Sequence, residues 1–209
     1  MKKAGRLAAA VFAAMLLVTG CGVPAEKKAV ETTPTQSSKI EQKEEGKNLK
    51  DAFKKDFKVG VAVNPYQLKD EQTKKIILEN FNSITMENEM KPESLLDWEG
   101  SEKSKDGMPA IKEETLEKAL KAAQEAGIPL RGHTLVWYSQ TPEWFFSKKY
   151  DPSKGYVDKA TMKKRMESYI KQVLTYCKEN YPGVVYAWDV VNEAVGDDGN
   201  YRTESMWYE

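Results

Sequence analysis

The chain has 209 residues, of which 40% are hydrophobic and 31% are charged. These proportions are ordinary for a globular domain in water. Lysine plus arginine and aspartate plus glutamate each number 32, so the formal net charge is zero. This balance argues against a nucleic-acid-binding protein, because such proteins carry an excess of positive charge.

Residues 1–20 have the organisation of a secretory signal peptide. Basic residues precede an apolar run from Leu7 to Val18, which is too short to cross a membrane as a helix. The Leu-Val-Thr-Gly-Cys that ends at Cys21 resembles a bacterial lipoprotein box, and this resemblance implies cleavage before Cys21 and lipid attachment to its thiol. We therefore expect an extracellular protein anchored to the bacterial cell membrane. The alternatives are an ordinary secreted protein with a chance cysteine, and an N-terminus that forms a buried helix.

The next segment, residues 21–48, is rich in Pro, Thr, Ser, Gln, Glu and Lys and poor in apolar residues. Such a segment buries too little surface to offset the entropy lost on ordering. We expect a flexible linker that carries the lipid on Cys21, followed by a folded domain over residues 49–209. The other cysteine, Cys177, lies on the apolar side of a predicted helix, and we expect it to be buried.

From residue 49 onward, strand and helix patterns alternate. Short β-branched runs predict strands, and apolar residues at helical spacing predict helices. The predicted order is strand 57–63, helix 69–81, strand 82–88, helix 111–127, strand 128–137, helix 161–180 and strand 184–193. Gly127 stands where helices commonly end.

Repeated strand–helix units with apolar strands predict a parallel sheet covered by helices. A doubly wound open sheet and a (β/α)8 barrel both fit this pattern. The open sheet commonly has a glycine-rich phosphate-binding turn after its first strand, but here the sequence Asn64-Pro65-Tyr66-Gln67 follows that strand. Barrels carry functional residues at the carboxyl ends of successive strands, and all four predicted strands end on polar or aromatic residues. We therefore predict an α/β fold of the (β/α)8 TIM barrel class.

The chain is too short for a complete barrel. A barrel has eight strands and typically about 250 residues, whereas residues 49–209 carry four predicted strands. A half barrel leaves unpaired strand edges and an open inner face. We expect the sequence to cover roughly the first four β/α units of a longer domain.

Two strand ends carry candidate site residues. The fourth predicted strand ends on Asn192 and Glu193. A carboxyl group in a partly dry pocket has a raised pKa and can act as a general acid near neutral pH, while the amide can hydrogen-bond a substrate hydroxyl. After the second strand, Glu87, Asn88 and Lys91 suit an uncharged ligand with many hydroxyl groups. The alternatives are a surface glutamate that caps the following loop, and a solvated polar loop after the second strand.

His133, in the third predicted strand, is the only histidine in the sequence. With one histidine and two separated cysteines, the sequence offers no zinc cluster and implies no metal or other cofactor. Aromatic residues follow this strand closely, and we expect Trp137 to stack on a sugar ring. The alternatives are a core histidine and aromatic residues that only pack in a core. A Ser-His-acid triad is disfavoured, because no Gly-x-Ser-x-Gly motif is present.

Three motifs in this order, MENEMK, RGHTLVWYSQTPEWF and WDVVNEA, resemble family 10 of the glycoside hydrolases, the retaining endo-1,4-β-xylanases. The similarity runs from about Phe53 to Glu209. It implies that Glu193 is the acid/base residue and that Asn192 binds the 2-hydroxyl group of the sugar next to the cleaved bond. It also implies glycone-side substrate contacts by Glu87, Asn88, Lys91, His133, Trp137 and Gln140.

Two features depart from the family pattern. Tyr138 stands where many members have a second histidine, which changes one local contact. The family's nucleophile is a second glutamate on a later strand, and the chain ends before that strand. Retaining hydrolysis needs two carboxyl groups roughly 5–5.5 Å apart, so we expect the nucleophile beyond residue 209 and an inactive fragment.

The leading hypothesis is therefore an endo-1,4-β-xylanase that needs no cofactor and binds xylan or xylo-oligosaccharides. Glu193 would be its acid/base residue. The alternatives are another β-glycanase of the same barrel type and a non-catalytic, surface-tethered sugar-binding protein.

Overall fold

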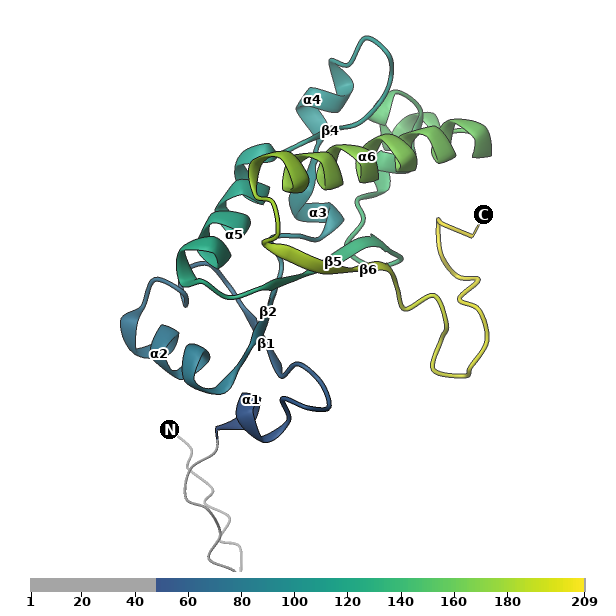
Figure 1. Ribbon diagram of the computed structural model, residues 1–209. Helices are drawn as coiled ribbons and strands as arrows, with labels where there is room; N and C mark the ends of the chain where they lie inside the picture. Colours follow the sequence, from purple (N-terminus) through teal and green to yellow (C-terminus); the bar gives the residue numbers. More distant parts are fainter. Residues whose placement is uncertain (1–47, 209) are drawn as a thin grey trace, which may run out of the picture. The chain divides into compact units, whose positions relative to one another are not determined.

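The computed structural model describes residues 48–208 (Figure 1). The predicted signal peptide, the lipid-attachment residue Cys21 and nearly all of the predicted linker lie outside the described residues. Within 48–208, none of the helices has the length and apolar character needed to span a lipid bilayer.

Four parallel strands form the main sheet. They are β1 (Gly60–Val63), β2 (Ser83–Met86), β5 (Leu130–Trp137) and β6 (Val185–Asn192). Each lies inside a predicted strand range. The spatial order is β1-β2-β5-β6 and every neighbouring pair is parallel. The carboxyl ends of all four strands therefore lie along one edge of the sheet.

Three longer helices connect these strands, as predicted. They are α2 (Glu71–Asn80), α5 (Glu113–Ala126) and α6 (Lys159–Asn180). Gly127 ends α5 with a left-handed φ of 65°, a conformation that glycine adopts without steric cost. α6 begins earlier than predicted, because the Asp158 side chain caps it by accepting a hydrogen bond from the Thr161 amide at 2.9 Å.

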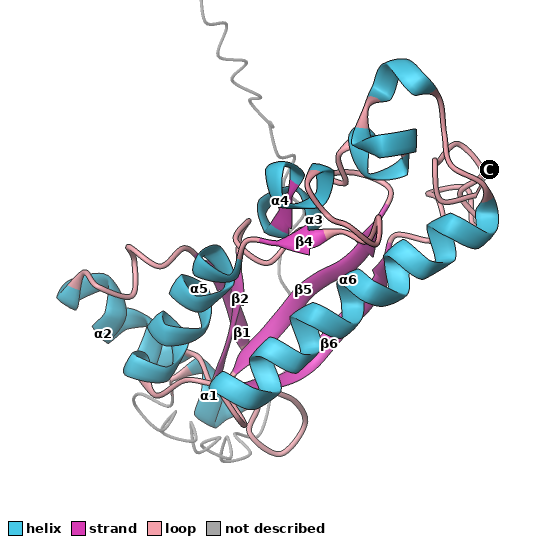
Figure 2. Cartoon of the chain, turned by 90° about the horizontal axis from the view of Figure 1, so that it is seen from above, coloured by secondary structure: helices cyan, strands magenta, loops and turns pink. Residues whose placement is uncertain are grey.

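The hydrophobic core lies where α5 and α6 cover one face of the sheet (Figure 2). Its fully buried members include Ile84 from β2, Leu120 from α5, and Tyr169 and Val173 from α6. Burying an aliphatic side chain of this size contributes about 1.5–3 kcal/mol. Cys177 is also buried in this core and is a free thiol, which confirms the prediction for it.

Short elements between the strands were not predicted from the sequence. A two-stranded antiparallel sheet and several single-turn helices occupy the connections: α1 (Leu49–Ala52), α3 (Pro92–Leu95), β3 (Leu96–Asp97), α4 (Trp98–Glu102), β4 (Ala110–Ile111), and the 3-10 turns Glu143–Phe146, Lys148–Tyr150 and Pro152–Lys154. Tertiary contacts hold them. Buried Arg165 of α6 donates from Nη1 to the carbonyl oxygens of Phe145 and Ser147, at 2.8 and 2.9 Å.

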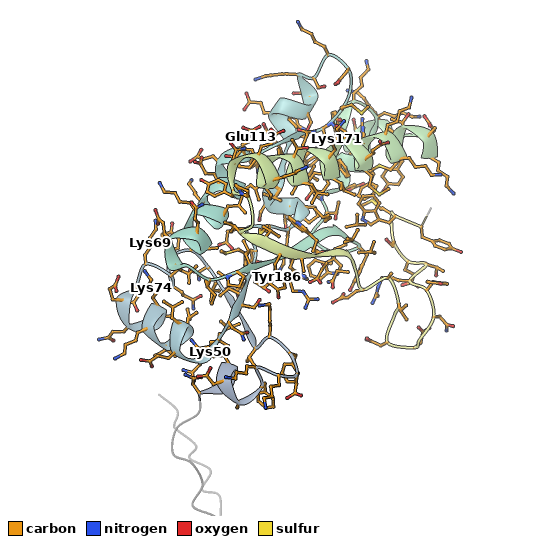
Figure 3. The ribbon with its side chains drawn as sticks, viewed as in Figure 1. Lys50, Lys69, Lys74, Glu113, Lys171 and Tyr186 are labelled. Carbon is orange, nitrogen blue, oxygen red and sulfur yellow. The ribbon has the colours of Figure 1, made fainter. Side chains whose placement is uncertain are left out.

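The sheet face opposite α5 and α6 is open in the described part of the chain. Tyr186 lies on this side of β6 (Figure 3) and is 43% exposed. Its hydroxyl group hydrogen-bonds Ser83 Oγ at 2.9 Å, which ties β6 to β2 across the sheet. Val190 and Val191 of β6 are exposed as well, and β6 is an edge strand. An open inner face and an unpaired edge are what the sequence predicted for part of a barrel.

Candidate active site

The carboxyl ends of β2, β5 and β6 bring most of the predicted site residues to one region. Beyond the end of β2, the Glu87 amide donates to the Val63 carbonyl oxygen at 2.8 Å, so the chain still follows β1 there. At the end of β6, Asn192 is in register with Trp137 of β5. The strand pairing therefore fixes the distances between the backbone positions of these residues, independently of their side-chain contacts.

Lys91 links the end of β2 to the segment that follows β5. Its ammonium group donates to Asn88 Oδ1 at 3.1 Å and to Gln140 Oε1 at 2.7 Å. The same nitrogen lies 5.2 Å from the centroid of the Trp137 ring, within range of a cation–π interaction. Three of the predicted contact residues thus surround the Lys91 ammonium group, which is itself a predicted contact.

Glu193 is held through both its side chain and its backbone. Trp137 Nε1 donates a hydrogen bond to Glu193 Oε2 at 3.0 Å. Arg202 Nε donates to the Glu193 carbonyl oxygen at 3.1 Å, and the Arg202 guanidinium lies 3.9 Å from the centroid of the Tyr138 ring. The Glu193 φ angle is 52°, a left-handed value that turns the chain away from the strand direction.

A cavity of about 280 Å³ lies beside this carboxylate. Its lining consists of Val136, Trp137, Tyr138, Val191, Asn192, Glu193, Ala194, Tyr201, Arg202, Ser205, Trp207 and Tyr208. Glu193 is the one carboxylate in this lining, and Trp137 and the tyrosines supply aromatic faces. The other predicted contact residues lie outside this lining. Glu87, Asn88 and Lys91 follow β2. His133 lies within β5, and Gln140 follows that strand.

The Glu193 side chain is exposed, which corrects the expectation of a partly dry pocket. The reason is its place in the sheet: β6 is the edge strand of the described sheet, so no neighbouring strand shields the carboxylate. Glu87 is exposed too, and its side chain makes no hydrogen bond or ion pair within residues 48–208. The backbone hydrogen bond to Val63 holds Glu87 at the edge of the sheet where the other site residues lie, but its side chain bonds to none of them.

His133 contacts a carboxylate that the sequence analysis did not single out. His133 Nδ1 and Asp189 Oδ2 are 3.0 Å apart, and Arg131 donates from Nε to Asp189 Oδ1 at 2.9 Å. Burial raises the pKa of Asp189, but the hydrogen bonds from Arg131 and His133 outweigh it and leave that pKa lowered. One signal in the sequence could have revealed this group, because Arg131 and His133 are two residues apart and so face the same side of a strand.

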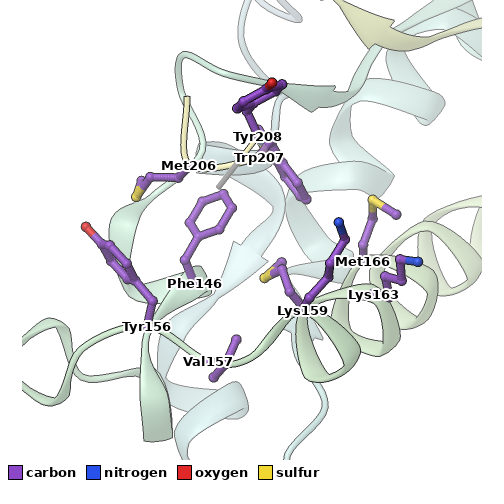
Figure 4. A pocket seen from close by; sticks show the side chains of 10 residues that line it. Phe146, Tyr156, Val157, Lys159, Lys163, Met166, Met206, Trp207 and Tyr208 are labelled. Atoms are coloured by element: carbon purple, nitrogen blue, oxygen red, sulfur yellow. The ribbon is translucent and has the colours of Figure 1, made fainter. Parts of the chain in front are cut away.

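A second cavity, of about 220 Å³, lies between the start of α6 and the last described residues (Figure 4). Its lining consists of Phe146, Tyr156, Val157, Lys159, Met162, Lys163, Met166, Met206, Trp207 and Tyr208. This lining has no carboxylate and is mainly apolar. This second cavity therefore offers no carboxylate for acid–base chemistry, in contrast to the cavity beside Glu193.

Comparison with known proteins gives a consistent set of relatives. The endo-1,4-β-xylanase B of Butyrivibrio fibrisolvens is 44% identical over 165 residues, which are 78% of this chain and 26% of that protein. The endo-1,4-β-xylanase A of Thermotoga maritima is 42% identical over 186 residues, which are 87% of this chain and 16% of that protein. The chain thus spans well under half the length of these relatives.

Solved structures agree with the sequence relatives. An endo-1,4-β-D-xylanase of Clostridium thermocellum, complexed with xylohexaose, matches with a TM-score of 0.65 and 39% identity, over 72% of this chain and 29% of that one. An intracellular xylanase of Thermoanaerobacterium saccharolyticum matches with a TM-score of 0.63 and 34% identity, over 78% of this chain and 48% of that one. These matches confirm the (β/α)8 fold class, of which the four parallel strands form part. The sequence pattern of glycosyl hydrolase family 10 matches residues 48–209, and the chain belongs to this family.

Proposed function

We propose that the complete protein is a retaining endo-1,4-β-xylanase that hydrolyses β-1,4-xylosidic bonds in xylan. The observation that carries the proposal is the position of Glu193. It stands at the carboxyl end of β6, hydrogen-bonded by Trp137 and beside a cavity with aromatic walls. Relatives that carry the name endo-1,4-β-xylanase at 42–44% identity support xylan as the substrate.

In this mechanism, Glu193 donates its proton to the glycosidic oxygen as the bond to the leaving sugar breaks. A second carboxylate attacks the anomeric carbon and forms a glycosyl-enzyme; Glu193, now ionised, then removes a proton from the water that releases the sugar. Glu193 is the one carboxylate in the lining of its cavity. We therefore place the nucleophile on a residue outside the described part of the chain.

The remaining site residues suit the recognition of a neutral sugar. Asn192 lines the cavity next to Glu193, where its amide can hydrogen-bond the 2-hydroxyl group. Asn88, Lys91 and Gln140 form one hydrogen-bonded group that can exchange internal bonds for bonds to hydroxyls. The Trp137 ring offers an apolar face for the C–H side of a sugar.

The test uses the protein expressed from its complete gene, with Glu193→Ala as the variant. Turnover of xylan should fall by roughly 10²–10⁴, the usual contribution of general acid–base catalysis. With an aryl xylobioside, whose leaving group needs no acid, azide should restore release of product, because azide attacks the glycosyl-enzyme without a general base. The product should be the β-xylobiosyl azide.

Glu204→Gln is the matched control, because Glu204 is an exposed carboxylate in the segment after β6 and lies outside the cavity lining. It should retain turnover. Full activity of the Glu193→Ala variant would disprove the assignment. Higher initial rates on carboxymethylcellulose than on xylan would instead indicate a different β-glycanase of the same barrel type.

We also propose that the mature protein is an extracellular lipoprotein. The support is the Leu-Val-Thr-Gly-Cys sequence at residues 17–21, followed by a polar segment. One acyl chain binds a membrane only weakly, whereas two or more hold a protein stably. In cells, the wild type should fractionate with membranes and Cys21→Ser should not. Equal membrane association of the two proteins would contradict the lipid anchor.

A further inference from the structure

Tyr138 holds Arg202 beside the carboxyl end of β6. The Arg202 guanidinium lies 3.9 Å from the centroid of the Tyr138 ring, well within range of a cation–π interaction. Tyr138 directly follows β5, whereas Arg202 lies in the segment after β6, so the contact joins the ends of two neighbouring strands. Within residues 48–208 the Tyr138 hydroxyl group makes no hydrogen bond, so the contact with Arg202 uses the ring.

Arg202 is bonded to the backbone at Glu193 and at the residue that follows it. Its Nε donates to the Glu193 carbonyl oxygen at 3.1 Å, and its own amide donates to the Ala194 carbonyl oxygen at 2.9 Å. Between these contacts the chain forms a closed loop, in which Val195 pairs with Tyr201. Arg202 therefore restrains the two peptide groups that follow the Glu193 side chain.

The backbone conformation of Glu193 depends on such restraints. Its φ angle is 52°, a left-handed value that is uncommon for residues other than glycine and persists where surrounding contacts impose it. Its exposed side chain has one hydrogen bond within residues 48–208, from Trp137 Nε1. Neighbouring residues at the end of β5 thus act on Glu193 in two ways. Trp137 holds the carboxylate directly, whereas Tyr138 acts on the backbone through Arg202.

We propose that Tyr138 is a positioning residue for the acid/base step, which stacks on Arg202 and thereby fixes the backbone that aims the Glu193 carboxyl group at the glycosidic oxygen. This inference rests on the proposed function, because it assumes proton transfer from Glu193 to a glycosidic bond. It gives a role to a position at which this chain has tyrosine and many family members have histidine. The competing explanation is a surface contact that stabilises the fold and has no effect on proton transfer.

The first measurement compares two aryl xylobiosides as substrates of the protein from the complete gene. A 2,4-dinitrophenolate group leaves without protonation, whereas a phenolate group leaves slowly unless an acid protonates the bond. In Tyr138→Ala, kcat/KM for the phenyl xylobioside should fall by about tenfold or more, since a misplacement of 1 Å costs up to about 10² in rate. For the dinitrophenyl xylobioside, kcat/KM should stay within about twofold of the wild type, because this bond breaks without a general acid.

Three variants separate the effect of the ring from other effects. Tyr138→Phe keeps the ring face and should recover most of the activity on the phenyl xylobioside that Tyr138→Ala loses. Arg202→Met removes the guanidinium and should show the same dependence on the leaving group as Tyr138→Ala. The double variant should show no further loss, because the effects of residues that act through one another are not additive.

Tyr186→Ala is the matched control. Tyr186 is 43% exposed and Tyr138 is 40% exposed. Tyr186 also faces a cation, because Lys58 Nζ lies 5.3 Å from its ring centroid. It lies near the start of β6, at the opposite end from Glu193, and outside the lining of the cavity beside that carboxylate. Loss of this ring should lower stability, while the ratio of the two kcat/KM values should stay as in the wild type.

The second measurement needs no substrate. Hydrogen exchange, followed by mass spectrometry of peptides that cover residues 193–202, reports on the hydrogen bond from the Arg202 amide to the Ala194 carbonyl oxygen. In Tyr138→Ala this segment should exchange faster than in the wild type. In Tyr186→Ala its exchange should be unchanged.

Equal losses on both xylobiosides in Tyr138→Ala would overturn the proposal, and so would wild-type kcat/KM on the phenyl xylobioside. A loss in Tyr138→Phe as large as in Tyr138→Ala, additive losses in the double variant, or unchanged exchange of residues 193–202 would also overturn it. Failure of the proposed function looks different, because the wild type would then release neither phenol nor dinitrophenol. The exchange measurement would still test whether Tyr138 restrains the backbone at Glu193.

Discussion

Trp137 and Glu193 are 56 residues apart in the sequence, and a hydrogen bond of 3.0 Å joins the indole Nε1 to the carboxylate Oε2. The register of β5 and β6 explains this proximity, because Trp137 is aligned with Asn192, the residue before Glu193. The indole therefore restricts the direction from which the carboxylate can approach a glycosidic oxygen. Reactions of this kind are sensitive to misplacement of about 1 Å.

Trp137→Phe should impair catalysis more than folding. The variant keeps an aromatic face but loses the donor to Glu193, so we expect kcat on xylan to fall by roughly tenfold. Trp98→Phe is the control: it also loses one indole hydrogen bond, to the Tyr150 carbonyl oxygen at 3.0 Å, but outside the cavity lining. Steady-state kinetics of both variants should show a loss only for Trp137→Phe, and equal losses would contradict a local effect.

Gly132→Ala should destabilise the domain. A Cβ atom at this position would lie 2.7 Å from Cε2 of the Trp188 indole and closer still to Cδ2 and Cε3. Overpacking of this kind costs about 1–3 kcal/mol, which urea unfolding would measure. In Gly60→Ala the added Cβ meets Ser83 at an ordinary 3.6 Å. That variant should be at least as stable as the wild type, and similar losses in both would argue against the clash.

The stability of the domain should depend on pH through Asp189. Hydrogen bonds from Arg131 and His133 outweigh the effect of burial and lower the pKa of Asp189 in the folded state. The ionised carboxylate therefore stabilises the fold above the unfolded-state pKa of about 3.9, and this contribution is lost as pH falls through the lower folded-state value. Urea unfolding between pH 6 and pH 3 should show a smaller pH-dependent loss for Asp189→Asn than for the wild type. Identical pH profiles would contradict this assignment.

Cys177 should react slowly with thiol reagents in the folded protein. Burial raises the pKa of this thiol to about 11, so little reactive thiolate is present near pH 8. In a Cys21→Ser background, the rate of reaction with a chromogenic disulfide should rise sharply in urea. A control with Cys177→Ala and Lys178→Cys moves the thiol to an exposed neighbour on α6 and should react fast without urea. Fast reaction of native Cys177 would contradict its burial.

The longer elements could be predicted because their patterns are local. A strand such as 185–192 shows its β-branched run, and a helix such as α5 shows apolar residues at helical spacing up to Gly127. The short β3–β4 pair and the turns of residues 143–154 could not be predicted in this way. Segments of two to five residues are too short to show a period, and contacts such as those of Arg165 hold them in place.

The sequence by itself determined the order of the long strands and helices and the (β/α)8 class, because these depend on local pattern and on motifs. The acid/base role of Glu193 stays a prediction from the motif that contains it. Only the tertiary structure decided which side chains meet. The pairing of β5 with β6 brings Asp189 to His133 and Trp137 to Glu193. It also leaves Glu193 exposed at an edge strand. Contacts and solvent exposure depend on register between segments distant in the chain, and no local pattern encodes that register.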